Sequence, residues 1–379
     1  RSVSRGLGDV YKRQDKDGMS SFQALATAIA AQVGTGNITG CATALLAGGP
    51  GAIFWMWLSA FFGMATIYGE AVLAQKFKTR SETGEVIGGP VYYIRQAFKG
   101  GFGKFLAGFF AVAIILALGL MGNMVQSNSI GDAFYNAFGV NKLIVGIIIA
   151  AIAAFIFLGG MKRIASVTEK VVPIMAALYI VGSLVVIIAN IKNIPNVFYQ
   201  IFVGAFNPTA VLGGAAGITV KAAMRYGVAR GLFSNEAGMG STPHAHAVAK
   251  VDKPEDQGIV AMIGVFLDTF VVLTLNALVI ICTLYTADGP LANGYVGDVT
   301  SVLSKTNLAQ TAFGSVFGAN FGNMFVAICL FFFAFSTSNV SGSASANASK
   351  TGQISRVAMP TAVPCVGSGS PLRSMRISQ

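Results

Sequence analysis

The sequence predicts an all-α membrane protein, folded as a polytopic bundle of transmembrane helices. Of its 379 residues, 54% are hydrophobic and only 11% are charged, and the mean hydropathy is +0.66. Soluble domains carry about 25% charged residues, so this charged fraction is less than half of the usual value. Several apolar runs also reach the length of about 20 residues that a bilayer span requires. These observations exclude a water-soluble enzyme and an intrinsically disordered chain.

The apolar runs predict about eight spans between residues 15 and 337. The connections between them are short, except at 76–103 and 287–308. In chain order, the predicted spans are 19–47, 50–75, 104–136, 143–159, 171–191, a broken span near 209–249, 258–286 and 309–337. No separate soluble domain is indicated.

The basic residues at the ends of these spans predict how the protein is oriented. Lysine and arginine favour the cytoplasmic side of a membrane. One set of alternate connections carries Lys76, Lys78, Arg80, Arg95, Lys99, Lys104, Lys162, Arg163, Lys170, Lys250 and Lys253. The opposite set carries only Lys142, Lys192 and Lys305. We therefore expect the first span to start on the cytoplasmic side.

The two ends of the chain differ in composition from the middle. Residues 1–14 carry a net charge of +3 and residues 338–379 one of +4, so 15–337 contribute only +4 of the total of +11. The tail is rich in Ser, Ala, Gly and Asn, a composition that does not bury enough apolar surface to become ordered. We expect a non-native or disordered leader, a transmembrane core at 15–337 and an aberrant low-complexity tail. Because most of the positive charge lies in these two ends, the net charge of +11 does not indicate a nucleic-acid partner.

Two glycine-rich segments interrupt predicted spans. Residues 34–37 (GTGN) lie in the first span, and residues 231–240 (GLFSNEAGMG) lie in the sixth. They are five spans apart, at matching positions of two successive halves, and an odd number of spans per half means that the second half is inverted. Such paired interruptions are the best sequence indication of a transporter binding site near the bilayer midplane. Close helix packing at glycine remains the alternative for each segment taken alone.

A helix that is broken inside a membrane has a specific chemistry. The break leaves N–H and C=O groups without partners, which is costly in hydrocarbon unless another ligand satisfies them. The N–H groups of the new helix N-terminus suit a carboxylate, and the freed carbonyls suit a hard cation such as Na⁺. Each break can therefore hold the carboxylate of an amino acid beside a coupling sodium ion.

The motifs around both breaks resemble a known family. The runs FQALATAIAAQVGTGNITG, GGPVYYI and ARGLFSNEAGMGSTPHAHA are similar to those of the alanine or glycine:cation symporter family, and the resemblance covers about 16–337. It implies a LeuT-like fold with a five-plus-five inverted repeat, of which the second repeat is incomplete here. It also implies sodium-coupled import of small neutral amino acids, such as alanine or glycine, by alternating access across a prokaryotic inner (plasma) membrane. The protein is then not an enzyme, and sodium is its coupling ion rather than a prosthetic group.

The resemblance further implies which residues form the sites. The substrate-binding residues are Thr35, Gly36, Asn37, Gln126, Phe233 and Thr337, with the carboxylate held by the N–H groups of Thr35 and Gly36. Phe233 would limit the size of the substrate side chain, although ordinary packing is its alternative role. The sodium ligands are the backbone carbonyls of Ala30 and Val33 together with Ser336 and Thr337.

Three acids lie within the predicted spans, where ionisable residues are usually functional. Glu70 lies in the second span, Glu236 beside the second break and Asp268 in the seventh span. Glu70 and Glu236 are interpreted as gating or helix-tying residues, with ordinary ion pairing to Lys or Arg as the alternative.

Four other functions remain to be weighed against sodium symport. The family pattern continues beyond Thr337 with further core helices that this sequence does not contain, so a non-functional truncated fragment is one alternative. A proton-coupled amino-acid transporter is another, although the absence of a carboxylate from residues 34–37 favours sodium. A membrane enzyme would need a nucleophile–base pair or a metal cluster, and a channel would need a continuous polar lining. Neither pattern is found in the sequence.

Overall fold

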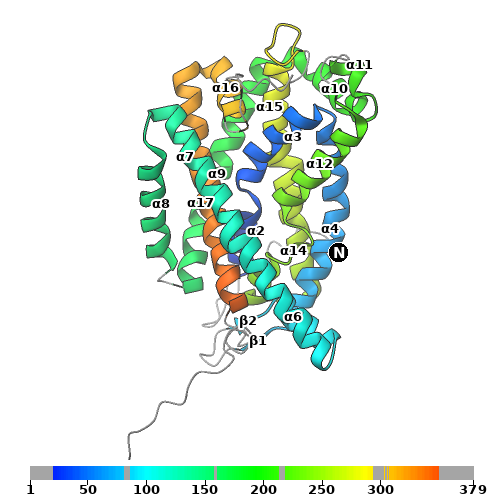
Figure 1. Cartoon of the computed structure of the whole chain (residues 1–379), viewed down its shortest axis with the longest axis vertical. Helices are drawn as coiled ribbons and strands as arrows, with labels where there is room; N and C mark the ends of the chain where they lie inside the picture. Colours follow the sequence, from blue (N-terminus) through cyan, green and yellow to red (C-terminus); the bar gives the residue numbers. More distant parts are fainter. Residues whose placement is uncertain are drawn as a thin grey trace, which may run out of the picture.

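The computed structural model describes residues 20–80, 86–157, 160–212, 218–292, 303, 305 and 307–349. Within these residues the chain is a bundle of helices with one small antiparallel sheet (Figure 1). The sheet lies at the end of the bundle away from α10 and α11. The predicted leader at 1–14 and the part of the predicted tail beyond Ser349 lie outside the described residues.

The elements up to residue 157 run from α2 to α8. They are α2 (Ser21–Gln32), the π-helix η1 (Gly36–Gly40), α3 (Cys41–Gly48), α4 (Ala52–Lys76), β1 (Thr79–Arg80), β2 (Val86–Ile87), α5 (Pro90–Ala97), α6 (Gly101–Ile114), the π-helix η2 (Ile115–Gly122), α7 (Asn123–Phe138) and α8 (Lys142–Phe157). Ser20 begins α2 with a capping box, because its side chain accepts from the N–H of Gln23 while the Gln23 side chain accepts from the N–H of Ser20.

The elements from residue 160 onward run from α9 to α17. They are α9 (Gly160–Ala189), the 3₁₀-helix η3 (Ile191–Asn193), α10 (Ile194–Phe206), α11 (Pro208–Leu212), α12 (Val220–Asn235), α13 (Pro243–Val248), α14 (Pro254–Val265), the π-helix η5 (Phe266–Leu273), α15 (Thr274–Leu284), α16 (Asn307–Phe317) and α17 (Ala319–Ser349).

Helices that can cross a membrane confirm the predicted fold class. In the described part of the chain, five helical stretches are long and apolar enough, namely Ala52–Lys76, Gly101–Phe138, Arg163–Ala189, Pro254–Leu284 and Ala319–Gly342. Helix α8 is apolar but shorter. The first predicted span is divided among α2, η1 and α3, and the sixth among α11, α12 and α13, as expected for interrupted helices.

The structure differs from the predicted spans at 309–337. This segment is two helices, α16 and α17, that pack against each other, and the chain reverses between them at Gly318, where φ is +83°. Glycine reaches this backbone conformation without steric cost. Because apolar residues flank the reversal on both sides, hydropathy does not reveal it. Helix α17 also continues to Ser349, beyond the end of the predicted span.

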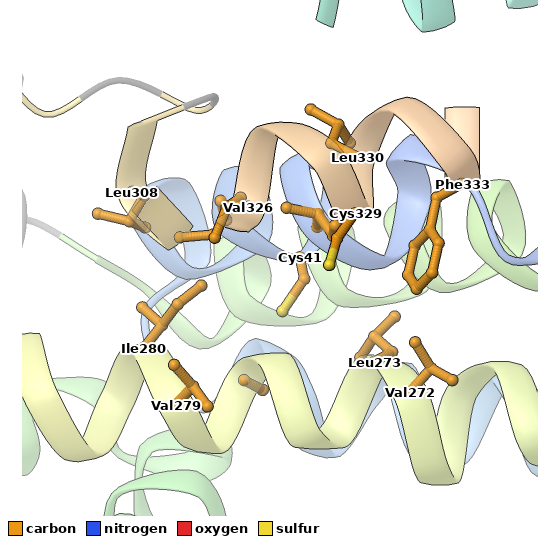
Figure 2. Close-up of a cluster of buried hydrophobic side chains, with 14 of the residues drawn as sticks. Cys41, Val272, Leu273, Val279, Ile280, Leu308, Val326, Cys329, Leu330 and Phe333 are labelled. Atoms are coloured by element: carbon orange, nitrogen blue, oxygen red, sulfur yellow. The ribbon is translucent and has the colours of Figure 1, made fainter. Parts of the chain in front are cut away.

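The interrupted first span lies in the middle of the bundle. Helix α2 contacts α9, α14 and α17, and α3 contacts α12 and α15. Figure 2 shows the apolar packing around α3: Cys41 faces Cys329 and Phe333 of α17 on one side and residues of η5 and α15 on the other. All of these side chains are fully buried or nearly so. The first break is therefore enclosed by protein, which a break at membrane depth requires.

Candidate functional site

The first break leaves two backbone carbonyls without their helical donors. Helix α2 ends at Gln32, and the chain bends at Val33 and Gly34 before the π-helix η1. In a continuous helix, the N–H groups of Gly34 and Asn37 would donate to the carbonyls of Ala30 and Val33. Here the N–H of Gly34 donates to Oδ1 of Asn37 (3.0 Å), and the N–H of Asn37 donates to the Gly34 carbonyl (3.3 Å). The carbonyls of Ala30 and Val33 therefore accept other ligands.

The hydroxyl of Thr337 in α17 lies against both freed carbonyls. Its Oγ1 is 2.9 Å from the carbonyl oxygen of Ala30, 3.3 Å from that of Val33 and 3.0 Å from that of Phe333. A hydroxyl has a single proton, so it does not fully satisfy three carbonyls at once. Four oxygen atoms thus converge at one buried point between α2 and α17, and such an arrangement is able to hold a hard cation.

Ser336 belongs to this oxygen cluster less directly. Its hydroxyl donates to the Phe333 carbonyl (2.9 Å) and lies 3.7 Å from the sulfur of Met175. Ser336 and Thr337 therefore share one carbonyl partner, but the Ser336 hydroxyl makes no hydrogen bond to Ala30 or Val33. Of the four residues predicted to bind sodium, the structure brings Ala30, Val33 and Thr337 into direct contact.

On the other side of the break, the side chain of Gln126 accepts the hydrogen bond that was predicted to hold a substrate carboxylate. The N–H of Thr35 donates to Oε1 of Gln126 (3.2 Å), and both residues are buried. The hydroxyl of Thr35 is buried without a partner among the described residues. The amide oxygen of Gln126 therefore lies where an oxygen of a substrate carboxylate is expected. The Thr35 hydroxyl beside it could form a second hydrogen bond to that carboxylate.

At Gly36 the first break meets the end of α12, just before the second break. A methyl group on Gly36 would lie 2.8 Å from Cα of Ser234 in the last turn of α12, so glycine allows the two backbones to approach. Phe233, predicted as a pocket wall, precedes Ser234 and is half-buried. It lies within α12 rather than in the break, because α12 continues to Asn235.

Asp268 links the first break to the end of α12, just before the second break, and the predicted set of site residues does not include it. This carboxylate is fully buried in η5, in the middle of the stretch Pro254–Leu284. It accepts from Nδ2 of Asn37 (2.7 Å), from the hydroxyl of Ser234 (3.1 Å) and from the hydroxyl of Thr269 (2.9 Å). An acid in an apolar span was the sequence signal, but its neighbours could not be deduced from the sequence. Residues 34–37 contain no carboxylate of their own, but the fold brings the carboxylate of Asp268 to Asn37.

Two further acids hold the segment that follows α12. Glu236 ends this helix in the left-handed conformation, with φ at +55°, and its carboxylate accepts from the hydroxyl of Ser241. Glu70 in α4 accepts from the N–H of Gly238 (3.1 Å). Glu70 thus connects α4 to the segment after α12, and the gating or helix-tying role of the two acids stays a prediction. The second interruption lies between Asn235 and Pro243, slightly later than the predicted 231–240.

Comparison with known proteins identifies the family. Residues 2–355 match the model of the sodium:alanine symporter family. The chain belongs to this family. Its members are transporters, so the chain is a transporter and not an enzyme.

Individual relatives agree with this assignment. The sodium/alanine symporter AgcS of Methanococcus maripaludis is 46% identical over 330 residues, which are 86% of this chain and 70% of that protein. The amino-acid carrier protein AlsT of Bacillus subtilis is 41% identical over 86% of this chain and 65% of its own length. A crystal structure of the Eremococcus coleocola manganese transporter superposes with a TM-score of 0.58 at 14% identity, covering 88% of this chain and 65% of that one. The last comparison establishes a shared fold alone.

Proposed function

We propose that the chain is a sodium-coupled symporter that imports small neutral amino acids, such as alanine or glycine, by alternating access with a LeuT-like arrangement of helices. The convergence of the Thr337 hydroxyl with the carbonyls of Ala30, Val33 and Phe333 is the observation that carries this proposal. Membership of the sodium:alanine symporter family supports it. The AgcS relative, named a sodium/alanine symporter, supports alanine as the first substrate to test.

The oxygen cluster is proposed as the sodium site. Its ligands are neutral carbonyls and a hydroxyl, which suit a monovalent hard cation better than a divalent one because they carry no compensating negative charge. The cluster joins α2 to α17, so a bound cation would hold these two helices together. Release of the cation would free them to move apart, and alternating access requires movement of this kind.

The substrate carboxylate is proposed to replace the side chain of Gln126 at the N–H of Thr35. A carboxylate makes a stronger hydrogen bond with a backbone N–H than a neutral amide oxygen does. The displaced amide would remain close enough to contact the substrate. The short distance between Gly36 and Ser234 leaves little space beside the carboxylate, which favours a small side chain, and Phe233 would add to this restriction.

A proton is the second candidate for the coupling ion, because the carboxyl group of Asp268 is able to bind and release one. The buried carboxylate contacts Asn37 in the first break and Ser234 at the end of α12, just before the second break. In the sodium-coupled mechanism, its negative charge would attract a cation to the region where the breaks meet. In a proton-coupled mechanism, the same carboxylate would take up and release the proton, so sodium dependence is the property that separates the two mechanisms.

The sodium proposal is tested at Thr337. We expect Thr337→Val to raise the sodium concentration for half-maximal alanine uptake by about tenfold or more, because it removes one ligand of the cation. Thr337→Ser keeps the hydroxyl and is expected to stay within about threefold of the wild type. The measurement is radiolabelled alanine uptake into proteoliposomes over a range of sodium concentrations.

Thr283→Val is the matched control for this substitution. The Thr283 hydroxyl donates within its own helix, to the carbonyl of Val279 (2.7 Å), so its loss should leave the sodium response unchanged. A sodium response of Thr337→Val equal to that of the wild type would contradict the assignment of this site.

A further inference from the structure

The side chain of Asn276 in α15 supports the backbone of the first break. In an α-helix, the N–H of Cys41 would donate to the carbonyl of Asn37. In the π-helix η1 it donates to the carbonyls of Gly36 and Ile38, so the Asn37 carbonyl is open to another donor. Nδ2 of Asn276 donates to this carbonyl at 2.8 Å and to that of Ile38 at 3.3 Å. The Asn276 amide therefore helps to hold η1 in its π-helical form.

The amide group of Asn276 is itself held in one orientation. The hydroxyl of Tyr179 in α9 donates to Oδ1 of Asn276 at 2.7 Å, so the NH₂ group points to η1. The reverse orientation would place Oδ1 against the carbonyl oxygens of η1, and neither atom of such a pair has a proton to share. Both residues are fully buried, where hydrogen bonds are stronger than in water. Tyr179 therefore acts on the first break through Asn276.

The ring of Tyr179 is fixed by aromatic neighbours from two other helices. Its centroid lies 5.7 Å from that of Phe313 in α16 and 5.2 Å from that of Phe333 in α17, which is within the range of favourable aromatic pairs. Both phenylalanine side chains are fully buried. Helix α16 lies at the end of the bundle opposite the β1–β2 hairpin (Figure 1). Tyr179 thus connects the packing of α16 to the first break.

Gln310 fixes α16 one turn before Phe313. Its Nε2 donates to the carbonyls of Ala133 and Asn323, both at 3.1 Å. Its Oε1 accepts from Nδ2 of Asn136 at 3.1 Å. These bonds tie α16 to α7 and to the first turns of α17. A displacement of α16 would break them and would withdraw Phe313 from the aromatic cluster.

We propose that Asn276 and Tyr179 are positioning residues for substrate binding, and that they make the shape of the first break depend on the position of α16. This role rests on the proposed function, because the N–H groups assigned to the substrate carboxylate, those of Thr35 and Gly36, directly precede the carbonyl that Asn276 holds. With η1 held in place, these N–H groups keep the direction that the carboxylate needs. A loosened η1 would have to be ordered by the substrate itself, which weakens binding.

Tyr179→Phe tests the proposal by removing one oxygen atom. The ring and its packing remain, but Oδ1 of Asn276 loses its donor. We expect the amide hydrogens of residues 36–41 to exchange about fivefold faster and the Kd for alanine to rise about fivefold, because one buried hydrogen bond is lost. Hydrogen–deuterium exchange mass spectrometry of the purified chain in detergent measures the first effect. Calorimetric titration with alanine in sodium chloride measures the second.

Asn276→Leu removes the amide and keeps a side chain of similar volume. It should change both quantities at least as much as Tyr179→Phe does. Because Tyr179 acts through this amide, the double variant should show no further loss relative to Asn276→Leu alone. Effects that multiply in the double variant would contradict a shared pathway.

Tyr285→Phe is the matched control, because Tyr285 is also buried and its hydroxyl donates to the carbonyl of Leu45 in the last turn of α3 (2.8 Å). It should lower the Tm about as much as Tyr179→Phe does, yet keep the wild-type exchange of residues 36–41 and the wild-type Kd for alanine. If the wild type bound no alanine, the proposed function would fail, and the exchange comparison would still decide the positioning role. Unchanged exchange of residues 36–41 in Tyr179→Phe, or an equal rise of the alanine Kd in Tyr285→Phe, would overturn the proposal.

Discussion

Asp268→Asn is expected to reduce sodium-driven alanine uptake by about 100-fold or more. The carboxylate accepts hydrogen bonds from Asn37, Ser234 and Thr269 without donating any. An asparagine would turn an NH₂ group towards at least one of these donors and would leave a buried polar group unsatisfied. It would also remove the negative charge that lies where the two breaks meet. Both effects act at the proposed binding region.

The same variant separates sodium coupling from proton coupling. Exchange of internal for external alanine needs no net movement of the coupling proton, so a proton-coupled carrier should keep exchange and lose concentrative uptake. A sodium-coupled carrier should lose both activities together and regain part of them at high sodium. Asp256→Asn is the control, because Asp256 is an exposed acid in the first turn of α14. Uptake by Asp268→Asn at the wild-type rate would contradict any coupling role for this carboxylate.

Gly36→Ala is expected to abolish alanine uptake and to destabilise the fold. The new methyl group would lie 2.8 Å from Cα of Ser234 and 3.0 Å from its Cβ, too close for two atoms that are not bonded. Either α12 or η1 would have to move, and such overpacking costs about 1–3 kcal/mol. The measurement combines alanine uptake with the Tm of the purified variant.

Gly40→Ala provides a matched comparison within the same π-helix. A methyl group at Gly40 would lie 3.7 Å from the carbonyl oxygen of Thr35, which is an ordinary contact distance. This variant is therefore expected to fold and transport nearly as the wild type does. If Gly36→Ala matched Gly40→Ala in both uptake and Tm, the close approach of the two breaks would not matter for transport.

The features that the sequence predicted best depend on local pattern. Long apolar stretches identified the membrane helices, and the glycines at 34 and 36 identified the first break, because both signals are contained in neighbouring residues. The proposed sodium ligands followed from the family resemblance, and the structure brings Thr337 to Ala30 and Val33 although more than 300 residues separate them.

The features that escaped prediction depend on tertiary packing. Asp268 was recognisable as an acid in a span, yet its contacts with Asn37 and Ser234 arise only when η5 packs against both breaks. The reversal at Gly318 was missed because one glycine between two apolar helices changes the mean hydropathy very little. The oxygen of Gln126 on the Thr35 N–H likewise depends on how α7 packs, and no spacing rule contains that information.

The most direct test is the affinity of the purified chain for alanine with and without sodium. If Na⁺ and the amino acid share the first break, saturating sodium should lower the Kd for alanine by about tenfold or more, and saturating alanine should lower the Kd for sodium by the same factor. Isothermal titration calorimetry in sodium chloride and in potassium chloride measures both. Equal affinities for alanine in the two salts would contradict sodium coupling.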